Sequence, residues 1–281
     1  MEKDEFEVKK FLLSKYHSKA KLEDLKKSLT EIECLNAKRQ LRDPAKVEFS
    51  TIVDGSWGVS KFDKIIISDK FDLSNQYDYI DAYVTLQHES WHCFQFNISS
   101  INEHIVSKKF AKEIGLIRIF QAWEPFLDFE TPKNIFTDAI NFKHYLSYYY
   151  GYAEKQAWDI ELISLKKDYS ELLKTEKPDN IVEQAIDLLT KRQALHKAEK
   201  EYFFGNEHFL QELKDRVSSD LANELIKNNH LPNKDAVFNE LKKIIAKGEI
   251  NFGKQNGTAP LRVSDRFAKN AEKIYFETLE K

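Results

Sequence analysis

Residues 85–94 read TLQHESWHCF and contain the motif His-Glu-x-x-His, with His88, Glu89 and His92 as its fixed members. In a helix, residues four positions apart lie one turn apart on the same face. Two imidazoles at this spacing can bind one zinc ion, and a carboxylate beside the first can take a proton from a water that the metal activates. One helical turn is therefore expected to carry two metal ligands, His88 and His92, and a general base, Glu89.

The sequence around the motif supports a helix preceded by a strand. Residues 79–86 contain no Gly or Pro and continue into the motif, which predicts a helix over residues 75–100. Upstream, residues 64–68 read KIIIS, a short β-branched run bounded by polar residues that is typical of a strand. A strand, a connection and a helix with this motif occur in the same order in zincin metallopeptidases. The chain from about residue 64 to residue 96 resembles that family, which implies a zinc-dependent peptidase.

A catalytic zinc site usually has three protein ligands, so a third must come from elsewhere. The metzincin pattern requires Gly at position 95 and His at position 98, but the chain has Gln95 and Ile98. A later glutamate, as in gluzincins, is the alternative. Glu154 is the preferred ligand, because Ala157 follows one turn later and its small side chain lets two helices approach closely.

The run from Glu154 to Ala157 resembles the Glu-x-x-Ala motif of several bacterial gluzincin families. That resemblance implies that Glu154 is a ligand and that a following acidic residue orients a histidine. Here Asp159 stands one place later than in the commonest version of the motif. Other third ligands stay open, namely Glu103, Glu113, Glu124, His144 and Glu161.

A tyrosine hydroxyl or a histidine near the metal can stabilise the oxyanion of a tetrahedral intermediate. Several such side chains precede Glu154 in the sequence, and Tyr150 and His144 are the preferred candidates. The alternative is that this aromatic stretch belongs to the core.

Composition indicates a helical protein without an obvious polyanionic partner. Charged residues are 32% of the chain, the net charge is −3, and both signs are interspersed, so neither nucleic acid nor an anionic membrane is expected. The N-terminus lacks an apolar segment of signal-peptide length, and no apolar run is long enough to span a membrane. Cys34 and Cys93 imply no disulfide framework, and Cys93 is expected to be a small buried side chain. A cytoplasmic location is predicted, with export by a route without a cleaved signal left open.

Few glycines and prolines predict a mainly α (α+β) fold. The resemblance to zincins implies a zincin-like catalytic core, and the pattern along the chain adds a small antiparallel sheet and additional helices at both ends. The expected sheet pairs residues 47–53 with 62–67 around a turn at 54–58. Three parts are predicted, a helical hairpin over 1–45, the core over 46–175 and a helical region over 176–281. Helices are expected over residues 3–18, 22–41, 75–100, 101–121, 134–150, 162–175, 180–203, 205–229, 233–246 and 264–280.

The favoured function is a zinc metallopeptidase that hydrolyses peptide bonds of a peptide or protein substrate. Zn²⁺ is the expected cofactor, held by His88, His92 and Glu154, with Glu89 as general base. The first alternative is a catalytically inactive protein that keeps a zincin fold as a binding or scaffold module. The second is a helical interaction protein in which the motif is accidental. The sequence does not indicate the substrate or the oligomeric state.

Overall fold

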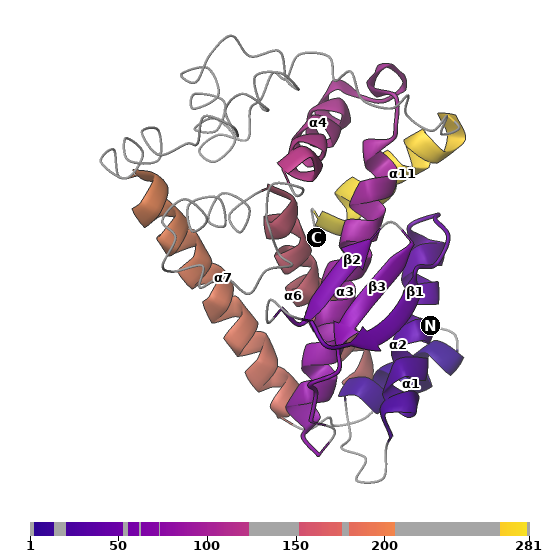
Figure 1. The fold of residues 1–281 in the computed structure, drawn as a ribbon, viewed down its shortest axis with the longest axis vertical. Coiled ribbons are helices and arrows are strands. Elements are labelled where there is room, and N and C mark those ends of the chain that lie inside the picture. The colour runs from indigo at the N-terminus through magenta and orange to yellow at the C-terminus, as the bar shows by residue number, and fades with distance from the viewer. Residues whose placement is uncertain are drawn as a thin grey trace. The chain divides into compact units, whose positions relative to one another are not determined.

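The structure is a computed structural model that describes residues 3–13, 21–52, 56–61, 63–72, 74–123, 152–175, 180–205 and 265–279. Within these ranges the protein is mainly helical with one small sheet, as predicted (Figure 1). The expected helices over 134–150 and 233–246 lie outside the described residues, as does the expected helix over 205–229 apart from residue 205. The described elements are α1 (Lys3–Leu13), α2 (Leu22–Arg39), β1 (Lys46–Ser50), β2 (Gly58–Lys61), β3 (Lys64–Ser68), α3 (Gln76–Ser99), η1 (Glu103–Ile105), α4 (Lys108–Trp123), α6 (Tyr152–Leu172), α7 (Ile181–Gly205) and α11 (Asp265–Leu279).

The chain divides into two compact units, and the boundaries between them fall inside helices α3, α6, α7 and α11. One unit comprises Met1–Asn97, Gln156–Gln193 and Asn270–Lys281, and the other comprises Ile98–Lys155 and Ala194–Lys269. In the second unit, a helix was expected over 101–121, but the structure has the short η1 followed by α4. The interruption has local causes, because Asn102 Oδ1 accepts the His104 N–H and Ser107 Oγ accepts the Phe110 N–H, which starts α4.

The sheet of the first unit is mixed, so the prediction of an antiparallel sheet is wrong in part. The strand order is β1-β3-β2, with β1 parallel to β3 and β2 antiparallel to it. The prediction assigned Gly58 to a turn, whereas it begins β2, and β2 takes the antiparallel place beside β3. The run with three isoleucines becomes the central strand, where Ile65 and Ile67 are fully buried.

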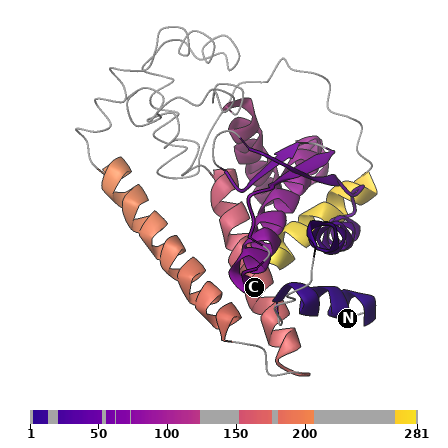
Figure 2. The same ribbon diagram turned by 60° about the horizontal axis from the view of Figure 1, so that its bottom comes forward.

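One hydrophobic core joins the sheet to the helices of the first unit. It draws on α1, α2, the sheet, α3, α6 and the first part of α7. The motif helix α3 is buried almost continuously from Tyr79 to Gln95, as expected of a helix that is covered on all sides. The C-terminal part of α11 lies beside α3, where Trp91 and Tyr275 stack with ring centroids 6.0 Å apart (Figure 2). The largest fully buried side chains of the unit include Trp91, Tyr79, Tyr83, Tyr275, Phe94, Leu12, Leu13, Leu25, Leu29 and Ile32.

A buried ion pair ties α2 to the motif. The Arg42 guanidinium donates to both carboxylate oxygens of Glu33, at 2.6 and 3.0 Å, and the two side chains are 1% and 0% exposed. The same guanidinium donates to the carbonyl and hydroxyl oxygens of Ser90, at 3.2 and 2.8 Å. Because Ser90 directly follows Glu89, this pair fixes the backbone of the motif turn.

A second buried cluster joins α1 to α6. The Lys9 ammonium lies 2.6 Å from Glu5 Oε1 and 2.6 Å from Asp168 Oδ1, and Tyr83 of α3 donates its hydroxyl to the other oxygen of Asp168. Burial and the Asp168 carboxylate raise the pKa of Tyr83 well above its usual value, so the phenol stays protonated and remains a donor.

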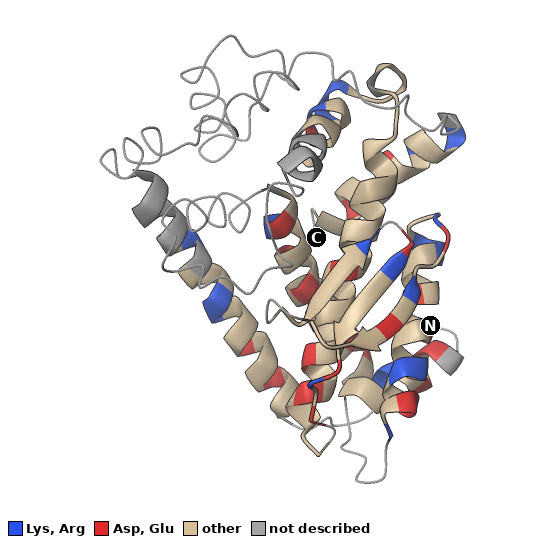
Figure 3. Cartoon of the chain, viewed as in Figure 1, with Lys and Arg blue, Asp and Glu red and all other residues tan. Residues whose placement is uncertain are grey.

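Basic and acidic residues are interspersed along the described elements (Figure 3). No helix in the described ranges combines the length and apolar character that a membrane span requires.

Candidate metal centre

The motif lies on α3, and its three key side chains are buried. The exposed fractions of His88, Glu89 and His92 are 9%, 7% and 6%. The helical spacing brings the two imidazoles together, with ring centroids 4.8 Å apart. Polar side chains at this depth require partners, so their hydrogen bonds determine what the site can bind.

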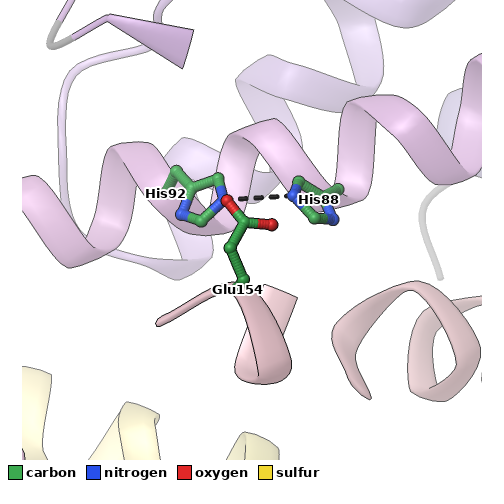
Figure 4. A group of neighbouring side chains, drawn as sticks. All are labelled: His88, His92 and Glu154. Atoms are coloured by element: carbon green, nitrogen blue, oxygen red, sulfur yellow. Dashed lines mark hydrogen bonds between the residues drawn. The ribbon is translucent and has the colours of Figure 1, made fainter. Parts of the chain in front are cut away.

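Glu154, near the start of α6, joins the two histidines (Figure 4). Each of the three residues offers one ligand atom, and these atoms all lie within 4.8 Å of one another. Glu154 is itself buried, and Ala157, one turn later, is 0% exposed. The small side chain of Ala157 therefore lies inside the protein, as expected of a residue that lets two helices approach closely.

His88 is oriented by a carboxylate of α6. Its Nδ1 lies 2.8 Å from Glu161 Oε1, and the other oxygen of Glu161 accepts Arg192 Nη2 of α7 at 2.7 Å. The Arg192 guanidinium also lies over the ring of Trp158, 4.5 Å from its centroid. A carboxylate can only accept, so this contact places the His88 proton on Nδ1 and leaves Nε2 with a lone pair.

His92 is oriented by an amide. Its Nδ1 lies 2.7 Å from Gln95 Oε1, a carbonyl oxygen that accepts the imidazole N–H. The Nε2 atom of His92 is then an acceptor as well. It faces Nε2 of His88 across 3.1 Å.

Two acceptor nitrogens at this distance cannot hydrogen-bond to each other unless a proton is added between them, whereas a shared cation satisfies both. Two nitrogens at about 2.0–2.1 Å from a tetrahedral zinc ion lie about 3.3 Å apart. The observed 3.1 Å and the nearby carboxylate of Glu154 therefore fit the ligand set of a zinc ion. Neutral imidazoles and a carboxylate are also the ligand chemistry that zinc accepts.

The general-base candidate Glu89 lies against the edge strand β2. A Cβ placed on Gly58 would lie 2.9 Å from Glu89 Cγ, 3.0 Å from Glu89 Oε1 and 2.5 Å from Thr85 Cγ2. Only glycine leaves room for this approach. The backbone of β2 therefore passes directly beside the carboxylate of Glu89.

Among the residues that the structure describes, the three preferred ligands form the one group with metal-binding spacing. Glu161 is the partner of His88 rather than a member of that group. The alternative Glu113, on α4, does not belong to it either, and the side chain of Glu103 lies outside the described part of the structure. Glu124, His144 and Tyr150 lie outside the described residues, so both candidates for oxyanion stabilisation stay predictions.

Cys93 is fully buried, as expected, and burial raises its thiol pKa to about 12. Its Sγ lies 3.5 Å from the Lys61 carbonyl oxygen of β2. A thiol that stays protonated is a poor metal ligand, because the thiolate is the form that binds.

Sequence reasoning missed the residues that orient the histidines. The resemblance pointed to an acidic residue after Ala157, and Asp159 stands one place too late for the commonest motif. The carboxylate on His88 is that of Glu161, and Asp159 accepts a 3.3 Å hydrogen bond from Gln193. Glu161 stands seven positions after Glu154, two helical turns along the same face, which is a usable signal. Gln95, three positions after His92, could have been found by the same argument.

Glu161→Ala should weaken zinc binding by about 10–100-fold, because His88 loses the group that fixes its proton and its ring orientation. Competition with a chelator would measure the affinity. Asp159→Ala on the same helix is the matched control and should change the affinity little. An equal loss in both variants would mean that α6 supports the site only by its general packing.

No family model, curated protein or solved structure significantly matches this chain.

Proposed function

We propose that this protein is a zinc-dependent metallopeptidase of the gluzincin type. The observation that carries the proposal is the pair of His Nε2 atoms, both acceptors and 3.1 Å apart, with the Glu154 carboxylate beside them. The order of β3, the motif helix and a later helix with a glutamate ligand fits a zincin-like core. His88, His92 and Glu154 would hold the ion.

When bound, zinc would supply Lewis acidity that lowers the pKa of a water to about 7 and polarises a peptide carbonyl. Glu89 is the proton carrier of the proposed reaction. Its carboxylate accepts a proton from the attacking water and gives it to the leaving amine. The contact with Gly58 restricts where this carboxylate can lie, and Arg42 holds the adjacent Ser90.

The proposed substrate is a peptide or protein, because the chemistry of this ligand set and base is amide hydrolysis. The free thiols of Cys34 and Cys93 support the predicted cytoplasmic location.

The test is metal content followed by hydrolysis. The purified chain should bind one zinc ion, and anomalous scattering at the zinc edge should place the ion at His88, His92 and Glu154. Hydrolysis of an unfolded protein substrate should stop when the metal is chelated and return with zinc. Zinc binding without hydrolysis of any peptide in a mixed library would favour the inactive binding or scaffold protein. Absence of zinc binding would overturn both.

A further inference from the structure

The start of the edge strand β2 is anchored to its surroundings on both sides of Gly58. Gly58 pairs with Ile67 of β3 in the antiparallel register, and Ile67 is fully buried. The preceding residue, Trp57, accepts the Ser68 N–H through its carbonyl oxygen at 2.9 Å. The Trp57 ring also lies against the ring of Phe71, with the centroids 4.9 Å apart. The backbone of β2 at Gly58 therefore resists displacement away from α3.

Two side chains of α3, one helical turn apart, face Gly58. A Cβ on Gly58 would lie 2.5 Å from Thr85 Cγ2 and 2.9 and 3.0 Å from Glu89 Cγ and Oε1, whereas carbon atoms in favourable contact are about 3.5–4.0 Å apart. The φ angle of Gly58 lies outside the left-handed region that favours glycine. Space, rather than backbone conformation, therefore requires a glycine at this position.

We infer that Gly58 is a positioning residue for Glu89, because its missing side chain lets the anchored backbone of β2 lie along the proposed general base. The inference rests on the proposed function. A glutamate side chain has three rotatable bonds, and a fixed surface against Cγ and Oε1 excludes every rotamer that would enter the strand. Displacement of a catalytic group by about 1 Å can lower a rate by about 10²-fold. The spacing between β2 and α3 at Gly58 thus limits where Glu89 can take up and release its proton.

An added methyl group at this position should move side chains rather than the strand. The Glu89 carboxylate stands at the end of a flexible side chain, and Thr85 can turn to the second χ1 rotamer that threonine adopts in helices. The backbone of β2 is held by its pairing with β3 and by the Trp57 contacts. We therefore expect Gly58→Ala to displace the Glu89 carboxylate and to leave the backbones of β2 and α3 in place.

The first test is the hydrolysis of an unfolded protein substrate by Gly58→Ala, which should be about 10²-fold slower than that of the wild type. Zinc affinity, measured by competition with a chelator, should not change, because the atoms nearest to the added methyl belong to Thr85 and Glu89 rather than to a proposed ligand. Gly115→Ala on α4 is the matched control. A Cβ there would meet no atom within 4 Å, so turnover should stay at the wild-type level. Loss of zinc affinity in Gly58→Ala would overturn the inference.

Two double variants separate positioning of the base from general packing. Thr85→Ser removes the methyl group nearest to the added Cβ. In the Gly58→Ala background it should therefore recover melting temperature but not turnover, since the contact with Glu89 remains. In a Glu89→Gln background, Gly58→Ala should lower the residual turnover little further, because the base that it positions is already absent. Recovery of turnover together with melting temperature, or losses that multiply in the Glu89→Gln background, would overturn the inference.

Crystal structures of the wild type and of Gly58→Ala provide a readout that does not depend on activity. A Glu89 carboxylate that is displaced beside an unmoved β2 would support the inference. An unmoved carboxylate beside a shifted strand would overturn it. These structures need neither substrate nor turnover, so a protein that hydrolyses nothing would refute the proposed function and still leave the displacement measurable.

Discussion

Glu89→Gln should lower peptide hydrolysis by about 10²–10⁴-fold, while the protein keeps its zinc and its melting temperature. The amide has nearly the same shape as the carboxylate but cannot accept the proton of the attacking water, so the loss equals the usual contribution of a positioned general base. Zinc should remain, because the proposed ligand set is His88, His92 and Glu154 and does not include Glu89. Parallel measurements of turnover, zinc stoichiometry and thermal unfolding check the three parts of this expectation.

The surroundings of Glu89 make the substitution a clean test. Its side chain lies against Gly58 of β2, and glutamine has nearly the same size as the glutamate that it replaces. Glu23→Gln, which changes an exposed glutamate on α2, is the matched control and should leave turnover unchanged. Wild-type turnover in Glu89→Gln would refute the proposed mechanism, and loss of zinc together with turnover would show that Glu89 has a structural role.

Arg42→Met should destabilise the protein by about 3–5 kcal/mol, the usual cost of removing one partner from a buried ion pair. Glu33 is 0% exposed, and without Arg42 its carboxylate keeps the 2.8 Å hydrogen bond from the Ala45 backbone N–H but loses the opposite charge. The Ser90 oxygens lose the same donor. Denaturant titration at constant pH would measure the change in the free energy of unfolding.

A double substitution distinguishes a lost ion pair from lost packing. Arg42→Met combined with Glu33→Met removes both charges and should recover much of the stability, because a buried pair replaced by apolar side chains is often neutral. Lys191→Met, which breaks an exposed pair with Asp187, should cost only about 0–1 kcal/mol. If Arg42→Met cost no more than this control, the pair would not be a major support of the motif turn.

The parts of the site that follow from short-range spacing could be predicted from the sequence. A four-residue spacing on one helix is enough to bring His88 and His92 together, and the Ala157 argument led to Glu154. The sequence places Gln95 and Glu161 on suitable helix faces, but the pairing of Glu161 with His88 could not be predicted from spacing on one helix. Glu161 is 73 positions from His88, and Gln156, which accepts from Gln95, is 61 positions from it. Such pairings depend on how separate helices pack, which one sequence does not encode in a readable pattern.

The sheet, too, was predicted in part: one strand was identified from the sequence, and its pairing was not. Residues 64–68 were correctly predicted as a strand, because three consecutive isoleucines favour one strongly. The neighbouring strand β2 was not predicted, because Gly58 looked like part of a turn. In the structure Gly58 begins β2 and lies against Glu89. A glycine between two short runs can mark a turn or a close approach, and only the position of the motif helix decides between them.

The central position of β3 bears on how the protein is made. A ribosome that has released the chain as far as Lys61 has released both outer strands of the sheet, and neither can pair with the other in the native arrangement. The strand that both require emerges last, immediately ahead of α3. Native pairing therefore cannot advance one strand at a time, and the sheet cannot form before β3 has left the exit tunnel.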